Sequence, residues 1–343
     1  MITIDNRNDY DYTNKRVFTE GEVMKLKKKL FTIISVLTLI LFLAACNHTE
    51  KTQSSQEANR NQLTIFTTIY PLKYFTERIG GDMVTTENIV PPGSDAHSVE
   101  INTKTMMKIA ESDALIQTGT GLEGFADSVV DSLKKEDVLN VNATENINFR
   151  SSEEETLNEE DHNEHGDESD KDPHVWLDPK RSIIMAENIK NALVQLKPEN
   201  KEEFENNFST LRTELEELDT EFKSMVSLSK TKTFIVSHAA YGYWEDSYGL
   251  KQIGISGLSP TDEPSQKQLT KIIDHVKENN LQYIFFESNL TNKVAEAVKD
   301  ETGTKALKLY NLESITDDNI RKNEDYFVIM RKNIEALKQA LNQ

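Results

Sequence analysis

The sequence predicts an α/β protein of two lobes, each with a parallel sheet flanked by helices, joined by one long rigid helix. Short apolar strands alternate with amphipathic helices in two separate blocks of the chain, and this order builds a parallel sheet covered by helices. Between the blocks, Asn200–Ser227 has a helical pattern without glycine or proline. At ~1.5 Å per residue, a helix of this length crosses a whole domain.

The first block follows residue 61, and we expect it to form the N-terminal lobe, residues 62–198. Apolar and β-branched runs predict strands, and the amphipathic runs between them predict helices. The expected elements alternate strand and helix and are, in order, Leu63–Thr68, Leu72–Ile79, Met83–Val90, Thr103–Glu111, Ala114–Thr118, Phe125–Lys134 and Val138–Val141. A further helix is predicted over Lys180–Gln195, because the preceding Pro179 can begin a helix.

The long helix is expected to be a linker over residues 199–228. Its apolar side chains recur at steps of three and four residues, which places them on one face of a helix. This stripe consists of Leu211, Leu215, Leu218, Phe222 and Met225. The linker is therefore predicted to be amphipathic.

The strand–helix pattern restarts after the linker, and we expect a C-terminal lobe over residues 229–343. Its predicted strands and helices are, in order, Thr233–Ser237, Lys251–Ile255, Gln266–Glu278, Tyr283–Glu287, Lys293–Asp300, Lys305–Tyr310 and a closing amphipathic helix, Tyr326–Leu341. The two lobes resemble each other in this pattern only.

The N-terminal region reads as a lipoprotein signal peptide, residues 24–45. A basic segment, Lys25–Lys29, precedes the apolar segment Phe31–Leu43, which is too short to span a membrane comfortably and suits the core of a signal peptide. The sequence Leu-Ala-Ala-Cys that ends at Cys46 is the pattern of a bacterial lipobox. We therefore expect cleavage before Cys46 and acylation of its thiol.

Residues 1–23 precede the basic segment, are polar and lack hydrophobic periodicity. The codons of Glu20-Gly21-Glu22 allow a purine-rich ribosome-binding sequence just before Met24. We interpret residues 1–23 as an upstream mis-start and expect translation to begin at Met24.

Residues 46–61 are expected to be a flexible tether, because they are polar and offer no apolar positions that could pack. Cys46 is the only cysteine, so the mature chain is expected to have neither a disulfide nor a Cys-ligated zinc site. Stable anchoring needs two or more acyl chains. The predicted location is the extracytoplasmic face of the cell membrane, with a lipid anchor of the Gram-positive type at Cys46.

An acidic stretch lies in the middle of the chain. Residues 153–172 contain eleven carboxylates and one lysine within a chain of net charge −19. Such a segment cannot desolvate its charges, so we expect a solvated loop over residues 152–172. The negative charge makes nucleic acid an unsuitable partner and favours a cation. The loop leads directly into Pro173–Pro179, which contains His174.

Four candidate metal ligands follow the strands of the two predicted sheets. His97 lies in the loop after the second strand, His238 ends a strand, and Glu313 follows the strand that ends at Tyr310. His174 reaches the same region from the last strand of the N-terminal lobe by way of the acidic loop. Ligands of open parallel sheets bind at the carboxyl ends of the strands, and three imidazoles with one carboxylate suit zinc at ~2.0–2.2 Å.

Each of these histidines taken alone is more often a structural residue, and four potential ligands in equivalent positions are a much rarer coincidence. Glu287 also ends a strand, and we rank it second to Glu313 as the fourth ligand. His162 and His165, three residues apart in the acidic loop, are predicted to capture metal weakly. His48 in the tether and His275 within a helix are expected to face solvent.

Several motifs together resemble one known family. They are the lipobox, Pro91–His97 (PPGSDAH), His174–Pro179 (HVWLDP), Val236–Trp244 (VSHAAYGYW) and Gly257–Ser265 (GLSPTDEPS). In this order they resemble the zinc-binding lipoproteins of bacterial ABC importers, which belong to the solute-binding class whose lobes are joined by a rigid helix. The resemblance covers the chain from Gln62 to its C-terminus.

The resemblance implies zinc ligands at His97, His174, His238 and Glu313. In the manganese-binding relatives the third ligand is typically glutamate and the fourth aspartate, so His238 and Glu313 favour Zn(II). Zinc-binding members often carry a His-rich acidic loop before the His-Val-Trp motif, as here. The resemblance further implies an ABC permease and its ATPase as partners, a lipid-anchored membrane location and no catalysis. We expect a monomer.

Three alternative functions stay open at this point. The first is a manganese- or iron-binding homologue, and the second is a surface adhesin whose metal only stabilises the fold. The third is a zinc hydrolase, in which three histidines hold the metal and Glu313 acts as the base. The sequence has no His-Glu-x-x-His, Gly-rich phosphate loop or Ser-x-x-Lys motif, which leaves zinc import as the preferred hypothesis.

Overall fold

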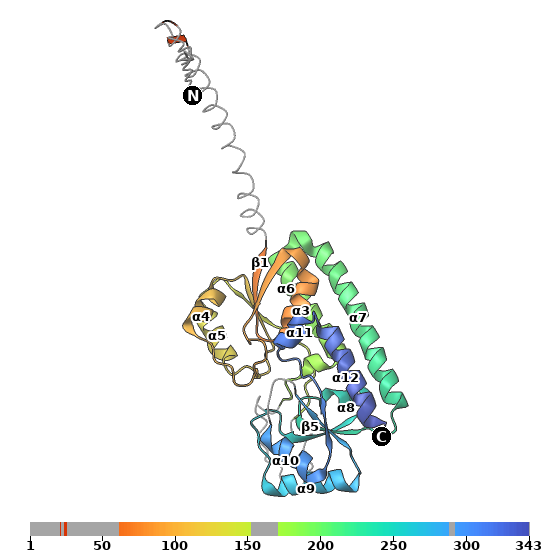
Figure 1. The fold of residues 1–343 in the computed structure, drawn as a ribbon. Helices are drawn as coiled ribbons and strands as arrows, with labels where there is room; N and C mark the ends of the chain where they lie inside the picture. Colours follow the sequence, from red (N-terminus) through yellow and green to blue (C-terminus); the bar gives the residue numbers. More distant parts are fainter. Residues whose placement is uncertain (1–20, 22–23, 26–61, 152–170, 288–291, 343) are drawn as a thin grey trace, which may run out of the picture. The chain divides into compact units, whose positions relative to one another are not determined.

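The computed structural model describes residue 21, residues 24–25, and residues 62–151, 171–287 and 292–342 (Figure 1). The chain divides into two units, Met1–Asn61 and Gln62–Gln343. Apart from residues 24–25, the predicted signal peptide lies outside the described residues, as do the tether, Cys46, His162 and His165. Within the described part of the chain, every helix is too short or too polar to cross a membrane.

The first lobe contains a four-stranded parallel sheet in the order β2-β1-β3-β4. Its strands are β1 (Leu63–Thr67), β2 (Val84–Asn88), β3 (Ala114–Gln117) and β4 (Leu139–Asn142). Its helices are α3 (Tyr70–Gly80), α4 (Thr103–Ala110), α5 (Ala126–Leu133) and α6 (Pro179–Leu196), with 3-10 turns η2 (Gly81–Met83), η5 (Val175–Leu177) and η6 (Pro198–Asn200). The predicted elements of this lobe are confirmed, with ends that differ by a few residues.

Two local features explain how helices of this lobe begin and end. Helix α3 ends at Gly80 and is followed by Gly81, whose φ of 52° falls in a region that glycine adopts without steric cost. Helix α6 begins at Pro179, and the Asp178 side chain accepts a hydrogen bond from the Lys180 N–H, which caps the first turn. The proline and cap together place the start of α6 directly after His174 and η5.

The second lobe repeats the architecture with a parallel sheet in the order β6-β5-β7-β8. Its strands are β5 (Thr233–His238), β6 (Lys251–Ser256), β7 (Tyr283–Phe286) and β8 (Lys305–Lys308). Its helices are α8 (Tyr243–Tyr248), α9 (Gln266–Glu278), α10 (Lys293–Thr302), α11 (Asp317–Arg321) and α12 (Tyr326–Leu341). The short helices α8 and α11 were not predicted, because five or six residues are too few to show a helical period.

Helix α7 (Lys201–Leu228) is the long linker, and it runs alongside both lobes (Figure 1). It packs against α6 of the first lobe and α12 of the second. The predicted stripe residues Leu211, Leu215, Leu218 and Phe222 are fully buried, and Met225 is 7% exposed. We propose residues 62–198 and 229–343 as the limits of the two lobes, because α7 occupies the chain between them.

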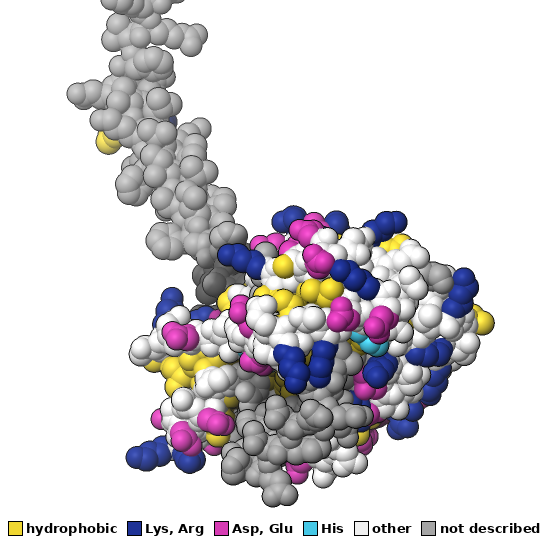
Figure 2. All heavy atoms as spheres, turned by 90° about the horizontal axis from the view of Figure 1, so that it is seen from below, with side chains coloured by type: hydrophobic (Ala, Val, Ile, Leu, Met, Phe, Trp, Pro, Cys, Tyr) yellow, Lys and Arg dark blue, Asp and Glu magenta, His cyan; other side chains and the backbone are white. Residues whose placement is uncertain are grey.

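The surface is charged with both signs. On the face drawn in Figure 2, acidic and basic side chains are interspersed over the described residues, and histidine shows at one small area only. A broad basic surface of the kind that binds nucleic acid phosphates is therefore not seen on the described part of this face.

Candidate metal centre

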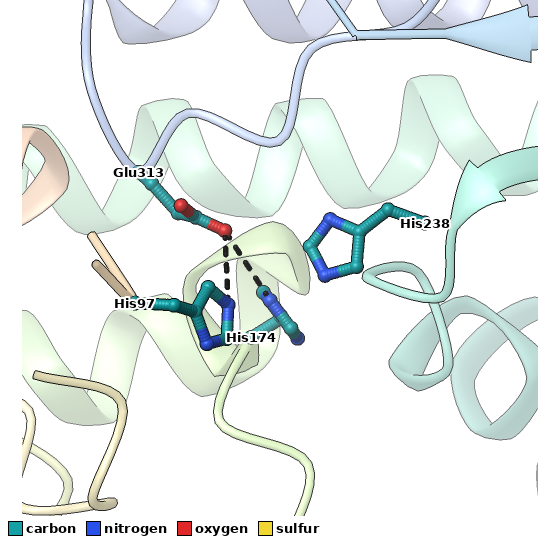
Figure 3. A group of neighbouring side chains, drawn as sticks. All are labelled: His97, His174, His238 and Glu313. Carbon is teal, nitrogen blue, oxygen red and sulfur yellow. Dashed lines mark ion pairs between the residues drawn. The ribbon is translucent and has the colours of Figure 1, made fainter. Parts of the chain in front are cut away.

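The four predicted ligands come together where the two lobes meet (Figure 3). Their ligand atoms all lie within 4.8 Å of one another. His97 comes from the loop after β2, His174 immediately precedes η5, and His238 is the last residue of β5. Glu313 follows β8 in the irregular segment before α11. This is the only group of three or more potential ligands of this kind among the described residues.

Hydrogen bonds join the segment around Glu313 to the start of helix α3 and to the loop that carries His97. The Tyr70 N–H donates to the Glu313 carbonyl over 3.1 Å, and the Gly93 N–H donates to the Ile315 carbonyl over 3.0 Å. The Ser314 hydroxyl donates to the Ser94 carbonyl over 2.7 Å. The loops of the two lobes are thus joined beside the cluster by backbone and side-chain bonds.

Asp172 orients His174, and both residues are fully buried. One carboxylate oxygen of Asp172 accepts hydrogen bonds from the His174 backbone N–H over 2.9 Å and from its Nδ1–H over 2.8 Å. This fixes the tautomer that leaves Nε2 free to bind a metal. The prediction that the acidic loop is solvated up to residue 172 is therefore wrong at Asp172, which is buried and whose Oδ1 accepts both of these bonds.

Glu287 performs the same role for His238. Its carboxylate lies 2.8 Å from Nδ1 of the ring, which is 1% exposed. Glu287 was ranked second as a metal ligand, and the structure places it behind His238 and outside the group of four. The Nε2 of His238 lies 2.7 Å from the Leu258 carbonyl. A metal that binds this nitrogen must therefore take the place of the Leu258 hydrogen bond.

Glu313 lies among the imidazoles and is fully buried. Its Oε1 is 3.5 Å from His97 Nε2 and 3.4 Å from His174 Nε2. Two ligands of a tetrahedral zinc ion, each at ~2.1 Å, are roughly 3.4 Å apart. These separations are therefore close to those that a tetrahedral zinc site requires.

The electrostatics of the cluster follow from burial and proximity. Burial alone would raise the pKa of Glu313, but the neighbouring imidazoles of His174, His97 and His238 hold it well below its usual 4.5. Burial alone would lower the pKa of His174, but Asp172 and Glu313 outweigh it, so this pKa lies above 6.5. Burial alone would likewise lower the pKa of His238, but the charge and hydrogen bond of Glu287 outweigh it, so this pKa also lies above 6.5.

The donor set fits a zinc ion. Nε2 of His97 and Nε2 of His174 are buried and have no hydrogen-bond partner. Buried polar atoms without partners are costly and rare, and a bound cation would use both lone pairs. Three nitrogens and one oxygen form the borderline-soft set that zinc accepts in four-coordinate sites.

Sequence reasoning missed the residues that support the ligands. Asp172 was assigned to a solvated loop, and its position two residues before His174 in Asp-Pro-His is the signal that was available. Asn311 lies two residues before Glu313 and was not predicted to have a role. Its side chain donates to both Glu287 and Glu313, and no sequence pattern indicates this.

A comparison with family models matches residues 65–340 to the family described as "ZnuA: Zinc-uptake complex component A periplasmic". The zinc-binding lipoprotein AdcA of Streptococcus pneumoniae (strain ATCC BAA-255 / R6) is 35% identical over 316 residues, which cover 92% of this chain and 62% of AdcA. The high-affinity zinc uptake system protein ZnuA of Bacillus subtilis is 32% identical over 314 residues, 92% of this chain and 98% of that protein. The chain thus spans less than two thirds of the length of AdcA.

Solved structures agree with these matches. The Zn(II)-bound ZnuA-like domain of Streptococcus pneumoniae AdcA has a TM-score of 0.69 at 34% identity, over 82% of this chain and 100% of that one. The laminin-binding protein Lmb of Streptococcus agalactiae has a TM-score of 0.71 at 30% identity, over the same shares of the two chains. Since the family model covers most of this chain and the two-lobed fold is shared, the chain belongs to the family of zinc-uptake complex component A.

Proposed function

We propose that this protein is the extracytoplasmic zinc-binding component of an ABC importer. It captures Zn(II) between its two lobes and delivers the ion to a membrane permease. The observation that carries this proposal is the buried cluster of three histidines and one glutamate at the meeting point of the lobes. The names of the relatives, a zinc-binding lipoprotein and a zinc uptake protein, support it.

The geometry explains how the chain would bind zinc selectively. Asp172 and Glu287 hold Nδ1 of His174 and His238, so that Nε2 of each ring is the nitrogen that would bind the ion, at His238 in place of the bond to the Leu258 carbonyl. Glu313 supplies one negative charge in a site that excludes bulk water, where Coulomb attraction is stronger than at the surface. Neutral imidazoles and an ionised carboxylate bind zinc tightly, and the binding weakens when protons compete for these ligands.

We propose a binding protein and not a hydrolase. Catalytic zinc sites keep one coordination position open for water, whereas four protein ligands fill a tetrahedral site. The carboxylate that a hydrolase needs as its base would here be Glu313, which is held among the imidazoles. This supports transport as the function of the cluster.

The proposal is tested by zinc titration of the purified chain. We expect one tightly bound zinc per chain and loss of that site in His174→Ala, because His174 is fully buried in the cluster. His275→Ala, which changes a histidine of helix α9 outside the cluster, is the matched control and should bind zinc normally. Tight zinc binding retained in His174→Ala would contradict the proposal, as would hydrolase activity that depends on the four residues.

The likeness to Lmb favours a second role. That protein is described as bifunctional, with adhesin and metal transporting activity. A laminin-binding role for this chain would persist after the zinc ligands are replaced, whereas growth in zinc-depleted medium would not. Comparing laminin binding with zinc-limited growth in His174→Ala cells separates the two roles.

We further propose that the protein is anchored to the membrane through acylated Cys46 and acts as a monomer with a permease and its ATPase. The relatives named as lipoproteins support the anchor. Cys46→Ser should leave the precursor uncleaved or release the protein into the medium, as cell fractionation and labelling with a fatty acid would show. Wild-type protein found wholly in the cytoplasm would contradict both the anchor and the importer.

A further inference from the structure

The amide of Asn311 lies between two buried carboxylates. Its Nδ2 donates to Oε1 of Glu287 and to Oε1 of Glu313, each over 3.0 Å. The Asn311 side-chain oxygen accepts the Glu313 backbone N–H over 3.2 Å. Asn311 itself is only 3% exposed. One side chain therefore uses both its donors and its acceptor on the residues that build the cluster.

These two carboxylates have different roles. Glu313 faces His97 and His174 directly, whereas Glu287 holds Nδ1 of His238. Without a donor between them, two carboxylates accepting bonds in one buried region would repel each other. The shared amide offsets this repulsion and sets the positions of Glu287 and Glu313 relative to each other.

The backbone around Asn311 is held as firmly as its side chain. Its carbonyl accepts the Trp176 indole N–H over 2.6 Å, and the Trp176 ring contacts the His174 ring with centroids 5.4 Å apart. Leu312 has a φ of 62°, a left-handed conformation that a non-glycine residue adopts only when its surroundings enforce it. With this turn in place, the Asn311 amide reaches the carboxylates of both Glu287 and Glu313.

The donors around Glu313 determine how its carboxylate is presented. Oε1 accepts from Asn311 and faces the two imidazole nitrogens, whereas Oε2 accepts from the Ala96 N–H over 3.2 Å. The carboxylate plane is thereby fixed, with one oxygen toward the metal position. A single oxygen with three imidazoles makes a four-coordinate site, which suits zinc better than it suits manganese, an ion that prefers more oxygen ligands.

We propose that Asn311 is a positioning residue that makes the site selective for zinc over manganese. Together with the Ala96 N–H it fixes the plane of the Glu313 carboxylate, so that one oxygen faces the metal position, and through Glu287 it keeps His238 aligned. This inference rests on the proposed zinc-binding function. A purely structural Asn311 that only satisfies buried carboxylates would contribute to stability and leave metal preference unchanged.

The test compares Asn311→Ala with Asn188→Ala. Asn188 is a matched control in helix α6, because its Nδ2 also donates two hydrogen bonds, to the carbonyls of Ala143 and Glu145, and contacts none of the cluster residues. For each full-length variant, the affinities for zinc and for manganese are measured by competition with a chelator. The visible spectrum of the Co(II) form reports coordination number, since four-coordinate Co(II) absorbs much more strongly than six-coordinate Co(II).

We expect Asn311→Ala to bind one metal ion per chain but to lower the zinc-to-manganese affinity ratio by about tenfold or more, the range typical of outer-shell partners. Its Co(II) absorption should weaken, while Asn188→Ala keeps the wild-type ratio and spectrum. If Asn311→Ala does not fold, Asn311→Ser replaces it, because serine shortens the side chain and removes the amide. The zinc-to-manganese affinity ratio of that variant then decides the test.

Two other results would overturn the inference and are distinguishable from each other. An unchanged ratio and Co(II) spectrum in the Asn311 variants, with a lower melting temperature only, would reduce Asn311 to a structural residue and leave the proposed function standing. Failure of the wild-type chain to bind zinc tightly would overturn the proposed function and, with it, this inference.

Discussion

Replacing His238 with glutamate (H238E) is expected to weaken zinc binding by at least about 100-fold, more than loss of an outer partner usually costs, while manganese binding changes far less. His238 ends strand β5, is 1% exposed and belongs to the four-residue cluster. Glutamate there removes an imidazole, which zinc favours, and adds oxygens, which suit manganese.

The environment of His238 adds to this effect. A glutamate at this position would lie beside Glu287, which now accepts a hydrogen bond from the ring. Two carboxylates in a buried site repel each other unless a cation or proton lies between them, so the variant should depend more strongly on bound metal for its stability.

The measurement is a pair of competition titrations, with zinc and with manganese, on wild-type protein and on H238E. His275→Glu supplies the control, because it introduces the same change on helix α9. Unchanged zinc affinity in H238E would exclude His238 as a ligand. Equal losses of zinc affinity and manganese affinity would show that His238 binds the metal but does not determine which metal is preferred.

Zinc affinity is also expected to fall steeply as the pH is lowered, with the fall beginning above pH 6.5. A proton competes with zinc for each imidazole nitrogen. The pKa of His174 and that of His238 lie above the ordinary value of 6.5, despite burial, because of Asp172 and Glu313 beside the first ring and Glu287 beside the second. Competition therefore starts at a higher pH than for an exposed histidine.

The stability of the metal-free protein should follow a different trend. Raised imidazole pKa values contribute stability that is present below about 6.5 and is lost as the pH rises through the folded-state pKa. The pKa of Glu313 is lowered, so its contribution is present above 4.5 and is lost as the pH falls through its folded-state value. Both stabilising contributions are therefore present between pH 4.5 and about pH 6.5. Zinc binding, in contrast, is favoured at higher pH.

These trends can be measured by chelator competition from about pH 5.5 to pH 8 and by thermal unfolding of the metal-free protein over the same range. We expect more than one proton to be taken up per zinc released, because more than one imidazole is a ligand. Zinc affinity that stays constant over this range would contradict a site with three imidazole ligands.

The identities of the four clustered residues could be predicted from the sequence, because local patterns carry the information. Apolar β-branched runs indicate where strands such as β2 and β5 end, and parallel strands bring their carboxyl ends to one edge. The stripe Leu211–Met225 likewise predicted the linker helix, since a helix of this length shows many turns of its period. Their roles as metal ligands stay a prediction that the zinc titrations test.

The supporting residues were decided by the tertiary structure alone. Glu287 reaches His238 across 49 residues of sequence, and the Trp176 indole reaches the Asn311 carbonyl across 135. The first contact depends on the pairing of β5 with β7 within one sheet and the second on how the lobes pack, and no local period encodes either of them. Asp172 shows the limit of composition most clearly: an acidic run predicts solvation on average, but this carboxylate is buried, and two N–H donors of His174 replace the water that its Oδ1 loses.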